Sequence, residues 1–234
     1  MTLTFMRHPP IDESGERCIG QTDVGLSPAG WAALAPLAER ACRLSPDRVL
    51  CSDLQRCRLL GEAIAARLGL AAEPNSTWRE VNFGAWENRT WSDIRVREPR
   101  VLGEWLVDFD KVSPPGGESF QQLQARVLLA IGDMGVSPVD SNFNTGGTPV
   151  PQPQPHYLVV THAGVIRAAA SAFSGTPLRY AFESAVPYGS LTSFHWDGIQ
   201  WSPVALALAP ENHPVGIAAR SLRVTGTLAS GRTT

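Results

Sequence analysis

The sequence lacks the features of several large protein classes. Its 234 residues carry a formal net charge of −2, so no basic excess predicts binding to nucleic acid or to an anionic membrane. No apolar run approaches the ~18 residues that a transmembrane helix requires. The first residues also lack the basic and then apolar pattern of a secretory signal peptide. We therefore expect a cytoplasmic protein with neither nucleic acid nor membrane as a partner.

Cysteine and lysine are scarce. The four cysteines form no Cys-x-x-Cys pair, and none has a spacing to histidine that resembles a zinc site. We therefore expect no metal and no cofactor, and this cysteine usage is typical of a reducing compartment. Cys51 and Cys57 lie in apolar contexts and are predicted to be small core residues, whereas Cys18 lies in a polar loop and is predicted to be exposed. Lys111 is the only lysine, so arginine supplies nearly all positive charge.

Apolar residues make up 43% of the sequence and indicate an ordinary globular core. Short apolar runs predict strands at residues 2–7, 48–52 and 157–161, and Asp197-Gly198 between two further runs predicts a hairpin. Helical spacing predicts helices over 53–68, 118–133 and 163–174, and one after the Ser27-Pro28 cap with Trp31, Leu37 and Ala41 on its apolar face. Glu118 and Ser119 are interpreted as a cap for the helix that follows them.

This alternation of strands and helices predicts an α/β fold. We expect a three-layer αβα sandwich whose sheet is mostly parallel with an antiparallel edge. A single domain is expected over residues 1–220, with a Pro-, Gly- and Asn-rich insert at about 137–155 that is too long for a routine connection. Residues 221–234 are predicted to form a flexible tail.

Two predicted strands end in a histidine. Arg7-His8 follows the first apolar run, and His162 follows the run at 157–161. Arg56 and Glu80 also fall near the ends of predicted strands or the starts of the next elements. Because the carboxyl ends of parallel strands meet at one crevice, we expect these five side chains to converge there.

Such a group of side chains has the chemistry of phosphoryl transfer. Arginines hold phosphate oxygens through planar, bidentate hydrogen bonds. A neutral histidine can attack phosphorus and carry the phosphoryl group, and a carboxylic acid can protonate the leaving oxygen. A second imidazole, as the imidazolium cation, can stabilise the charge of the group in transfer. The cations are part of the chain, so this reaction requires no metal.

Four ordered motifs give the sequence a resemblance to a known family. They are Arg7-His8, Ser52 to Arg58, Glu80 to Glu87 and Thr161 to Arg167. In this order they resemble the histidine phosphatase superfamily, which has the phosphoglycerate mutase-like fold, over roughly residues 1–210. Within it the chain is most similar to the alpha-ribazole phosphatases, through the segments Cys18 to Val24, Leu54 to Arg58, Phe83 to Trp91 and Pro114 to Ser119.

The resemblance implies roles for individual residues. His8 becomes the phosphohistidine nucleophile, Arg7 and Arg56 clamp the phosphate, His162 is the second imidazole and Glu80 is the acid and base. It also implies substrate contacts at Gln21, Thr22 and Ala163. One departure concerns Pro9, which stands where the superfamily usually has Gly or Thr and offers no backbone N–H to phosphate.

These observations predict a metal-independent phosphomonoesterase with a small phosphate ester as its partner. The resemblance implies alpha-ribazole 5'-phosphate, or its cobamide form, in cobalamin nucleotide-loop assembly. Two alternatives stay open: a phosphoglycerate mutase or broad-specificity sugar-phosphate phosphatase, and an inactive phosphate-binding module. A homodimer is a further open alternative. Trp86, Trp91 and Trp105 either stack on an aromatic leaving group or fill the core.

Overall fold

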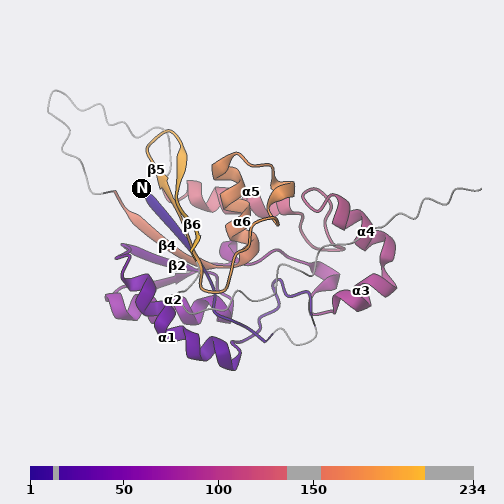
Figure 1. Ribbon diagram of the computed structural model, residues 1–234, viewed down its shortest axis with the longest axis horizontal. Coiled ribbons are helices and arrows are strands. Elements are labelled where there is room, and N and C mark those ends of the chain that lie inside the picture. The colour runs from indigo at the N-terminus through magenta and orange to yellow at the C-terminus, as the bar shows by residue number, and fades with distance from the viewer. Residues whose placement is uncertain (13–15, 136–153, 209–234) are drawn as a thin grey trace, which may run out of the picture.

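The computed structural model describes residues 1–12, 16–135 and 154–208. Within these ranges one mixed sheet has the strand order β3-β2-β4-β1-β5-β6 (Figure 1). Its strands are β1 (Thr2–Arg7), β2 (Arg48–Cys51), β3 (Ala72–Pro74), β4 (His156–Thr161), β5 (Leu191–Trp196) and β6 (Trp201–Leu208). The first four run parallel, while β5 pairs antiparallel with β1 and β6 antiparallel with β5. The predicted antiparallel edge is therefore the hairpin at one side of the sheet.

Helices cover both faces of the sheet, so the layers are those of a three-layer sandwich (Figure 1). On one face lie α1 (Pro28–Cys42) and α2 (Gln55–Leu68), and on the other lie α5 (Phe120–Gly132) and α6 (Ala163–Ser174). The side chains of β1 and β4 divide between these faces as strand periodicity requires. Phe5 and Val159 pack in the core beneath α5 and α6, whereas Met6 and Val160 pack beneath α1 and α2.

The helices begin and end at residues that satisfy free backbone groups. The Ser27 hydroxyl accepts from the Gly30 N–H at 3.1 Å, and Pro28 occupies the first helical position of α1. Glu118 and Ser119 were predicted to cap α5. Ser119 does so, through a capping box with Gln122. At the other end of α6, Gly175 adopts a φ of 66°, a left-handed conformation that favours glycine.

An aromatic cluster fills the space beside the sheet. It lies around η2 (Gly84–Trp86), α3 (Trp91–Arg97) and α4 (Pro99–Val107). The rings of Trp86 and Trp105 lie 5.7 Å apart, and those of Trp91 and Trp105 stack at 5.9 Å. Trp86 and Trp105 are buried, and the Trp86 indole N–H donates to Glu98 at 2.9 Å. The structure therefore confirms that Trp86 and Trp105 fill the core.

Two local predictions were wrong, and one short strand was missed. Cys18 is 1% exposed, because residues around it pair with the chain near Asn88 and Arg89, and burial raises the pKa of its thiol. Trp31 is 55% exposed, since the buried face of α1 is formed by Gly30, Leu37, Ala38 and Ala41. The short strand β3 was not predicted at all, because its three residues end on Pro74 and carry no apolar run.

Several predictions concern residues outside the described ranges. The expected tail at 221–234 lies there, as does the insert at 137–155 except for residues 154 and 155. Among the helices that the structure describes, none is both long and apolar enough to cross a membrane. The two remaining short elements are η1 (Ser76–Trp78) and η3 (Leu178–Tyr180).

Candidate active site

The register between two central strands brings the two predicted histidines together. β1 and β4 run parallel with Arg7 opposite Thr161. His8 directly follows β1 and His162 directly follows β4, so the two histidines emerge side by side. The His8 backbone N–H donates to the Thr161 carbonyl at 2.9 Å and continues the ladder by one residue. The two imidazole rings lie 5.2 Å apart, and both side chains are buried.

The surroundings of His8 fix which of its ring nitrogens carries the proton. Nδ1 lies 2.7 Å from the Pro9 carbonyl oxygen, which can only accept, so Nδ1 is the donor. In a neutral ring the lone pair is then on Nε2. Burial lowers the pKa of His8 well below its usual value, and the positive charges of Arg56 and Arg7 lower it further. Pro9 lacks a backbone N–H, but its carbonyl orients the neutral His8 imidazole.

Arg56 is held by the backbone of a distant loop. It is the second residue of α2 and is 1% exposed. Its Nη1 donates to the Thr22 carbonyl at 2.8 Å, its Nη2 to the Gly20 carbonyl at 2.5 Å, and its Nε to Nδ1 of His162 at 3.3 Å. A guanidinium has five N–H groups. These three hydrogen bonds leave two donors of a fixed cation beside the histidines.

The loop that holds Arg56 is itself organised by Glu87. The Glu87 carboxylate accepts from the backbone N–H groups of Gly20, Gln21 and Thr22 at 3.2, 2.8 and 3.0 Å. It also accepts from the Thr22 hydroxyl at 2.5 Å. The loop passes so close to the segment after Glu80 that a Cβ on Gly20 would lie 2.2 Å from the Val81 carbonyl oxygen. Glu87 ends the Glu80 to Glu87 motif, and no role was predicted for it from the sequence.

The two polar loop residues expected to bind substrate make contacts within the protein. The Thr22 hydroxyl donates to Glu87, and the Thr22 carbonyl accepts from Arg56. The Gln21 side chain donates to the Glu80 carbonyl at 3.2 Å. In the structure, both residues therefore position the arginine and the acid, and their expected contact with substrate stays a prediction.

His162 contacts Arg56 on one ring nitrogen and a cysteine on the other. Because Arg56 donates to Nδ1, the proton of the neutral ring is on Nε2, which lies 3.3 Å from Sγ of Cys57. Burial lowers the pKa of His162 well below its usual value, with Arg56 and His8 adding to the shift. The second imidazole is therefore neutral in this state, not the imidazolium that the chemistry first suggests. Ala163, the next residue, begins α6.

Arg7 lies on the other side of His8 and contacts the loop before β5. Its Nη1 donates to the Val186 carbonyl at 2.6 Å, and its guanidinium carbon lies 3.8 Å above the ring of Tyr188. The Tyr188 ring is also 5.4 Å from that of His8. No sequence motif marks Tyr188. It reaches the site because β5 pairs with β1, which brings the preceding loop against the end of β1.

Glu80 points its carboxylate at the start of α6. One oxygen accepts from the Gly164 backbone N–H at 3.1 Å, and the other from its neighbour Val81 at 3.0 Å. The approach to Gly164 is so close that a Cβ there would lie 2.1 Å from the carboxylate. Glu80 thus lies next to His162, the residue that precedes α6, as the strand-end argument predicted.

A third arginine lies on the same face of α6 as Gly164, three residues further along. The Nε and Nη2 of Arg167 each lie 3.4 Å from the Ser184 carbonyl oxygen, and its guanidinium carbon is 4.9 Å above the Phe182 ring. Burial lowers the pKa of Arg167 to about 10, while the charge of Glu80 raises it and that of Arg7 lowers it. The sequence assigned Arg167 no role, although its helical spacing from Gly164 is a signal that could have identified it.

Arginine side chains supply the positive charge at this edge of the sheet. Among the described residues, no group of three or more His, Cys, Asp or Glu side chains is arranged to hold a metal ion. The charges of Arg7 and Arg56 act on both imidazoles, and that of Arg167 acts on Glu80 and Arg7. Such a site is suited to a dianion and to the exchange of a proton with the group attached to it.

The profile of the histidine phosphatase superfamily (branch 1) matches residues 3–208 of this sequence. The chain belongs to that superfamily. The match covers nearly all of the described sheet, and it confirms the predicted family and supports the predicted class of phosphoric monoester hydrolase.

Curated relatives are similar over different shares of their length. A bifunctional protein of Mycobacterium tuberculosis (strain ATCC 25618 / H37Rv) is 34% identical over 127 residues, which are 53% of this chain and 35% of that protein. The chain thus spans about a third of the first curated relatives that it matches. Glucosyl-3-phosphoglycerate phosphatase of M. tuberculosis (strain CDC 1551 / Oshkosh) is 28% identical over 75% of this chain and 76% of its own length.

Solved structures confirm the predicted fold. The mycobacterial glucosyl-3-phosphoglycerate phosphatase superimposes with a TM-score of 0.74 at 24% identity, covering 89% of this chain and 99% of that one. The alpha-ribazole phosphatase from Shigella flexneri superimposes with a TM-score of 0.74 at 22% identity, covering 91% of this chain and 100% of that one. At these identities the likeness concerns the fold and leaves the substrate undecided.

Proposed function

We propose that this protein hydrolyses small phosphate monoesters through a phosphohistidine on His8, without a metal. The observation that carries the proposal is the buried, neutral His8, whose Nδ1 donates to the Pro9 carbonyl and whose Nε2 therefore holds the lone pair. The positive charges of Arg56 and Arg7 lie close enough to act on the same ring. A neutral imidazole beside two fixed cations is suited to attack the phosphorus of a bound dianion.

The reaction has two balanced steps. In the first, Nε2 of His8 forms a bond to phosphorus while the ester P–O bond breaks, and the leaving oxygen takes the proton of the Glu80 carboxylic acid. In the second, water forms a P–O bond as the P–N bond breaks, and its proton returns to Glu80. Arg7 and the two remaining donors of Arg56 hold the oxygens of the transferring group. His162 keeps Arg56 in place.

The first candidate substrate is alpha-ribazole 5'-phosphate or its cobamide form. Its support is the set of motifs shared with the alpha-ribazole phosphatases, together with the likeness in fold to one of them. One argument for it is weakened by the structure. Trp86 and Trp105 are buried among other aromatic rings, so an aromatic base has no stacking surface on these two side chains.

The second candidate is a phosphate ester whose leaving group carries a carboxylate, as in a phosphoglycerate derivative. The observation that favours it is the position of the Arg167 cation. Arg167 lies on the same face of α6 as Gly164, whose backbone N–H donates to the Glu80 carboxylate. A glucosyl-3-phosphoglycerate phosphatase is also similar over three quarters of both chains, at 75% and 76%.

One assay tests the chemistry and the substrate together. Phosphate release is measured in EDTA from alpha-ribazole 5'-phosphate, glucosyl-3-phosphoglycerate, 3-phosphoglycerate and fructose bisphosphate. We expect release with a kcat/KM for one ester at least about tenfold above the others, a difference of about 1.4 kcal/mol in transition-state binding. Conversion of 3-phosphoglycerate into its 2-isomer without phosphate release would identify a mutase. Phosphate binding without any turnover would identify an inactive binding module.

A further inference from the structure

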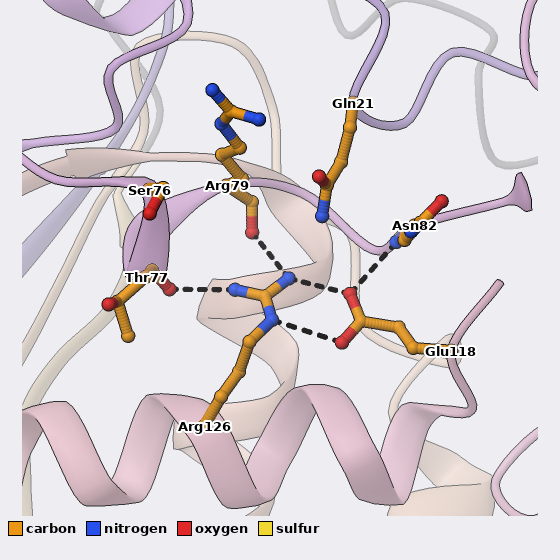
Figure 2. Close-up of a pocket in the computed structure, with 7 residues that line it drawn as sticks. All are labelled: Gln21, Ser76, Thr77, Arg79, Asn82, Glu118 and Arg126. Atoms are coloured by element: carbon orange, nitrogen blue, oxygen red, sulfur yellow. Dashed lines mark hydrogen bonds and ion pairs between the residues drawn. The ribbon is translucent and has the colours of Figure 1, made fainter.

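An ion pair between Arg126 and Glu118 contacts the backbone beside Glu80, and the proposed reaction does not use it directly. Arg126 of α5 and Glu118, just before that helix, are joined by two hydrogen bonds, Nε to Oε2 at 3.0 Å and Nη2 to Oε1 at 2.7 Å (Figure 2). The pair borders a groove of about 410 Å³ lined by polar side chains: Gln21, Ser76, Thr77, Arg79, Asn82, Glu118 and Arg126.

Arg126 binds the backbone of the segment that carries Glu80. Its Nη1 donates to the Thr77 carbonyl at 2.7 Å, and its Nη2 donates to the carbonyls of Arg79 and Glu80 at 2.8 and 2.9 Å. Figure 2 shows the carbonyl oxygens of Thr77 and Arg79 turned toward the same guanidinium. One planar cation therefore fixes the direction of three carbonyls within four residues.

Glu118 holds the other end of the same segment. Its Oε1 accepts from the Asn82 backbone N–H at 2.8 Å, and its own backbone N–H donates to the Asn82 carbonyl at 2.9 Å. The chain is thus fixed on both sides of Glu80, by Arg126 before it and by Glu118 after it. The carbonyl of Glu80 faces α5, while its carboxylate reaches the Gly164 N–H on α6.

We propose that Arg126 and Glu118 are positioning residues for Glu80, which hold its backbone so that the carboxyl group meets the leaving oxygen. This inference rests on the proposed role of Glu80 as the acid. The side-chain hydrogen bonds that the pair makes to this segment all go to the backbone of residues 77–82. Proton transfer depends steeply on geometry, and a displacement of about 1 Å can cost about 100-fold in rate.

The test compares two substrates that differ in their need for an acid. Glycerol 3-phosphate has a poor leaving group, whereas p-nitrophenolate departs without a proton. We expect Arg126→Met to lower kcat on glycerol 3-phosphate by about 10- to 100-fold and on p-nitrophenyl phosphate by less than about threefold. Glu80→Gln is expected to show the same selectivity, and adding Arg126→Met to it is expected to cause no further loss on glycerol 3-phosphate.

Controls separate positioning from folding. Arg48→Met removes another bidentate ion pair, that with Glu73, without touching residues 77–82, and is expected to change neither rate. Because loss of the Arg126 side chain can itself prevent folding, Arg126→Lys and Glu118→Gln carry the same comparison with milder changes. We expect each to give a smaller loss with the same selectivity.

The outcomes distinguish the inference from the proposed function. Equal losses on both substrates in the folded Arg126 and Glu118 variants, or losses that add fully to those of Glu80→Gln, would overturn the positioning role. If Glu80→Gln is selective and the Arg126 variants are not, the inference fails and the acid role of Glu80 stands. If Glu80→Gln itself affects both substrates equally, the acid role is wrong and the inference falls with it.

Discussion

Arg56 donates its Nε–H to Nδ1 of His162, across 3.3 Å in the buried centre of the site. This single contact joins the start of α2 to the end of β4, between residues that are 106 positions apart in the sequence. Burial lowers the pKa of this imidazole, and the permanent positive charge that Arg56 places next to it lowers the pKa further. Arg56 and His162 are therefore held together by a direct hydrogen bond.

The first prediction concerns the nucleophile. His8→Asn should abolish the phosphoenzyme and reduce turnover by several orders of magnitude, because an amide cannot replace the imidazole whose Nε2 holds the nucleophilic lone pair. The measurement is acid-labile phosphate on the protein after a rapid quench, with phosphate release in parallel. His195→Asn, a change at an exposed position of β5, is the matched control. Near-normal turnover in folded His8→Asn would refute the mechanism.

The second prediction concerns metals. Turnover should be unchanged after exhaustive chelation with EDTA, because arginines provide the positive charge at the site and the described residues hold no metal-ligand cluster. The measurement is kcat/KM before and after dialysis against the chelator. Activity that is lost and then restored by magnesium, manganese or zinc would contradict the proposal.

The third prediction concerns the charge of the leaving group. Arg167→Met should raise KM for 3-phosphoglycerate by about tenfold, the effect of losing one hydrogen-bonded charge contact. Glycerol 3-phosphate differs from it by the carboxylate and should be hydrolysed almost as before. Arg43→Met, at an exposed arginine of a surface ion pair with Glu39, is the control. If both substrates lose equally and the melting temperature falls, Arg167 only anchors the loop at Ser184.

The fourth prediction concerns pH and stability. His8 and His162 have lowered pKa values in the folded protein, so below pH 6.5 the unfolded chain binds protons that the folded one does not. Their contribution to the free energy of unfolding is thus fully present above the usual histidine pKa and is lost as the pH falls. Each contributes a slope of up to about 1.4 kcal/mol per pH unit.

Urea unfolding at pH 7.5, 6.5 and 5.5 measures this slope. The carboxylates that pair with arginine, such as Asp53 and Glu73, have lowered pKa values and stay ionised across that window. His8→Asn should therefore reduce the slope. A free energy of unfolding that is constant from pH 7.5 to 5.5 would contradict the prediction.

The fifth prediction concerns the aromatic cluster. Trp86 is fully buried against Trp91 and Trp105, so Trp86→Ala should lower the free energy of unfolding by about 3–5 kcal/mol. Any loss of activity should be similar for all substrates. Trp31→Ala removes an indole that is 55% exposed and should have little effect on stability. A selective loss against alpha-ribazole 5'-phosphate at unchanged melting temperature would restore the stacking interpretation.

Much of the fold was predictable because its information is local. Short apolar runs predicted β1, β2 and β4, and the Asp197-Gly198 turn predicted the hairpin of β5 and β6. Caps such as Ser27 and Ser119 marked where helices begin. Trp31 and Cys18 were mispredicted because burial depends on which surface a neighbouring segment covers, and that is not encoded in local spacing.

The same division applies to the site. The sequence by itself determined the reactive groups, because His8, Arg7, Arg56, Glu80 and His162 each stand beside a recognisable strand end or motif. The rule that parallel strands end at one edge then predicted that these groups meet.

Only the tertiary structure decided how these groups are held. The proton on Nδ1 of His8, the contact between Arg56 and His162 and the ring of Tyr188 beside Arg7 all depend on hydrogen bonds and packing between distant segments. The Arg126–Glu118 pair belongs to the same class, since it acts on carbonyl and amide groups whose directions exist only after folding. Residue types are local, but a tautomer, a lowered pKa and an oriented carboxylate are properties of the folded surroundings.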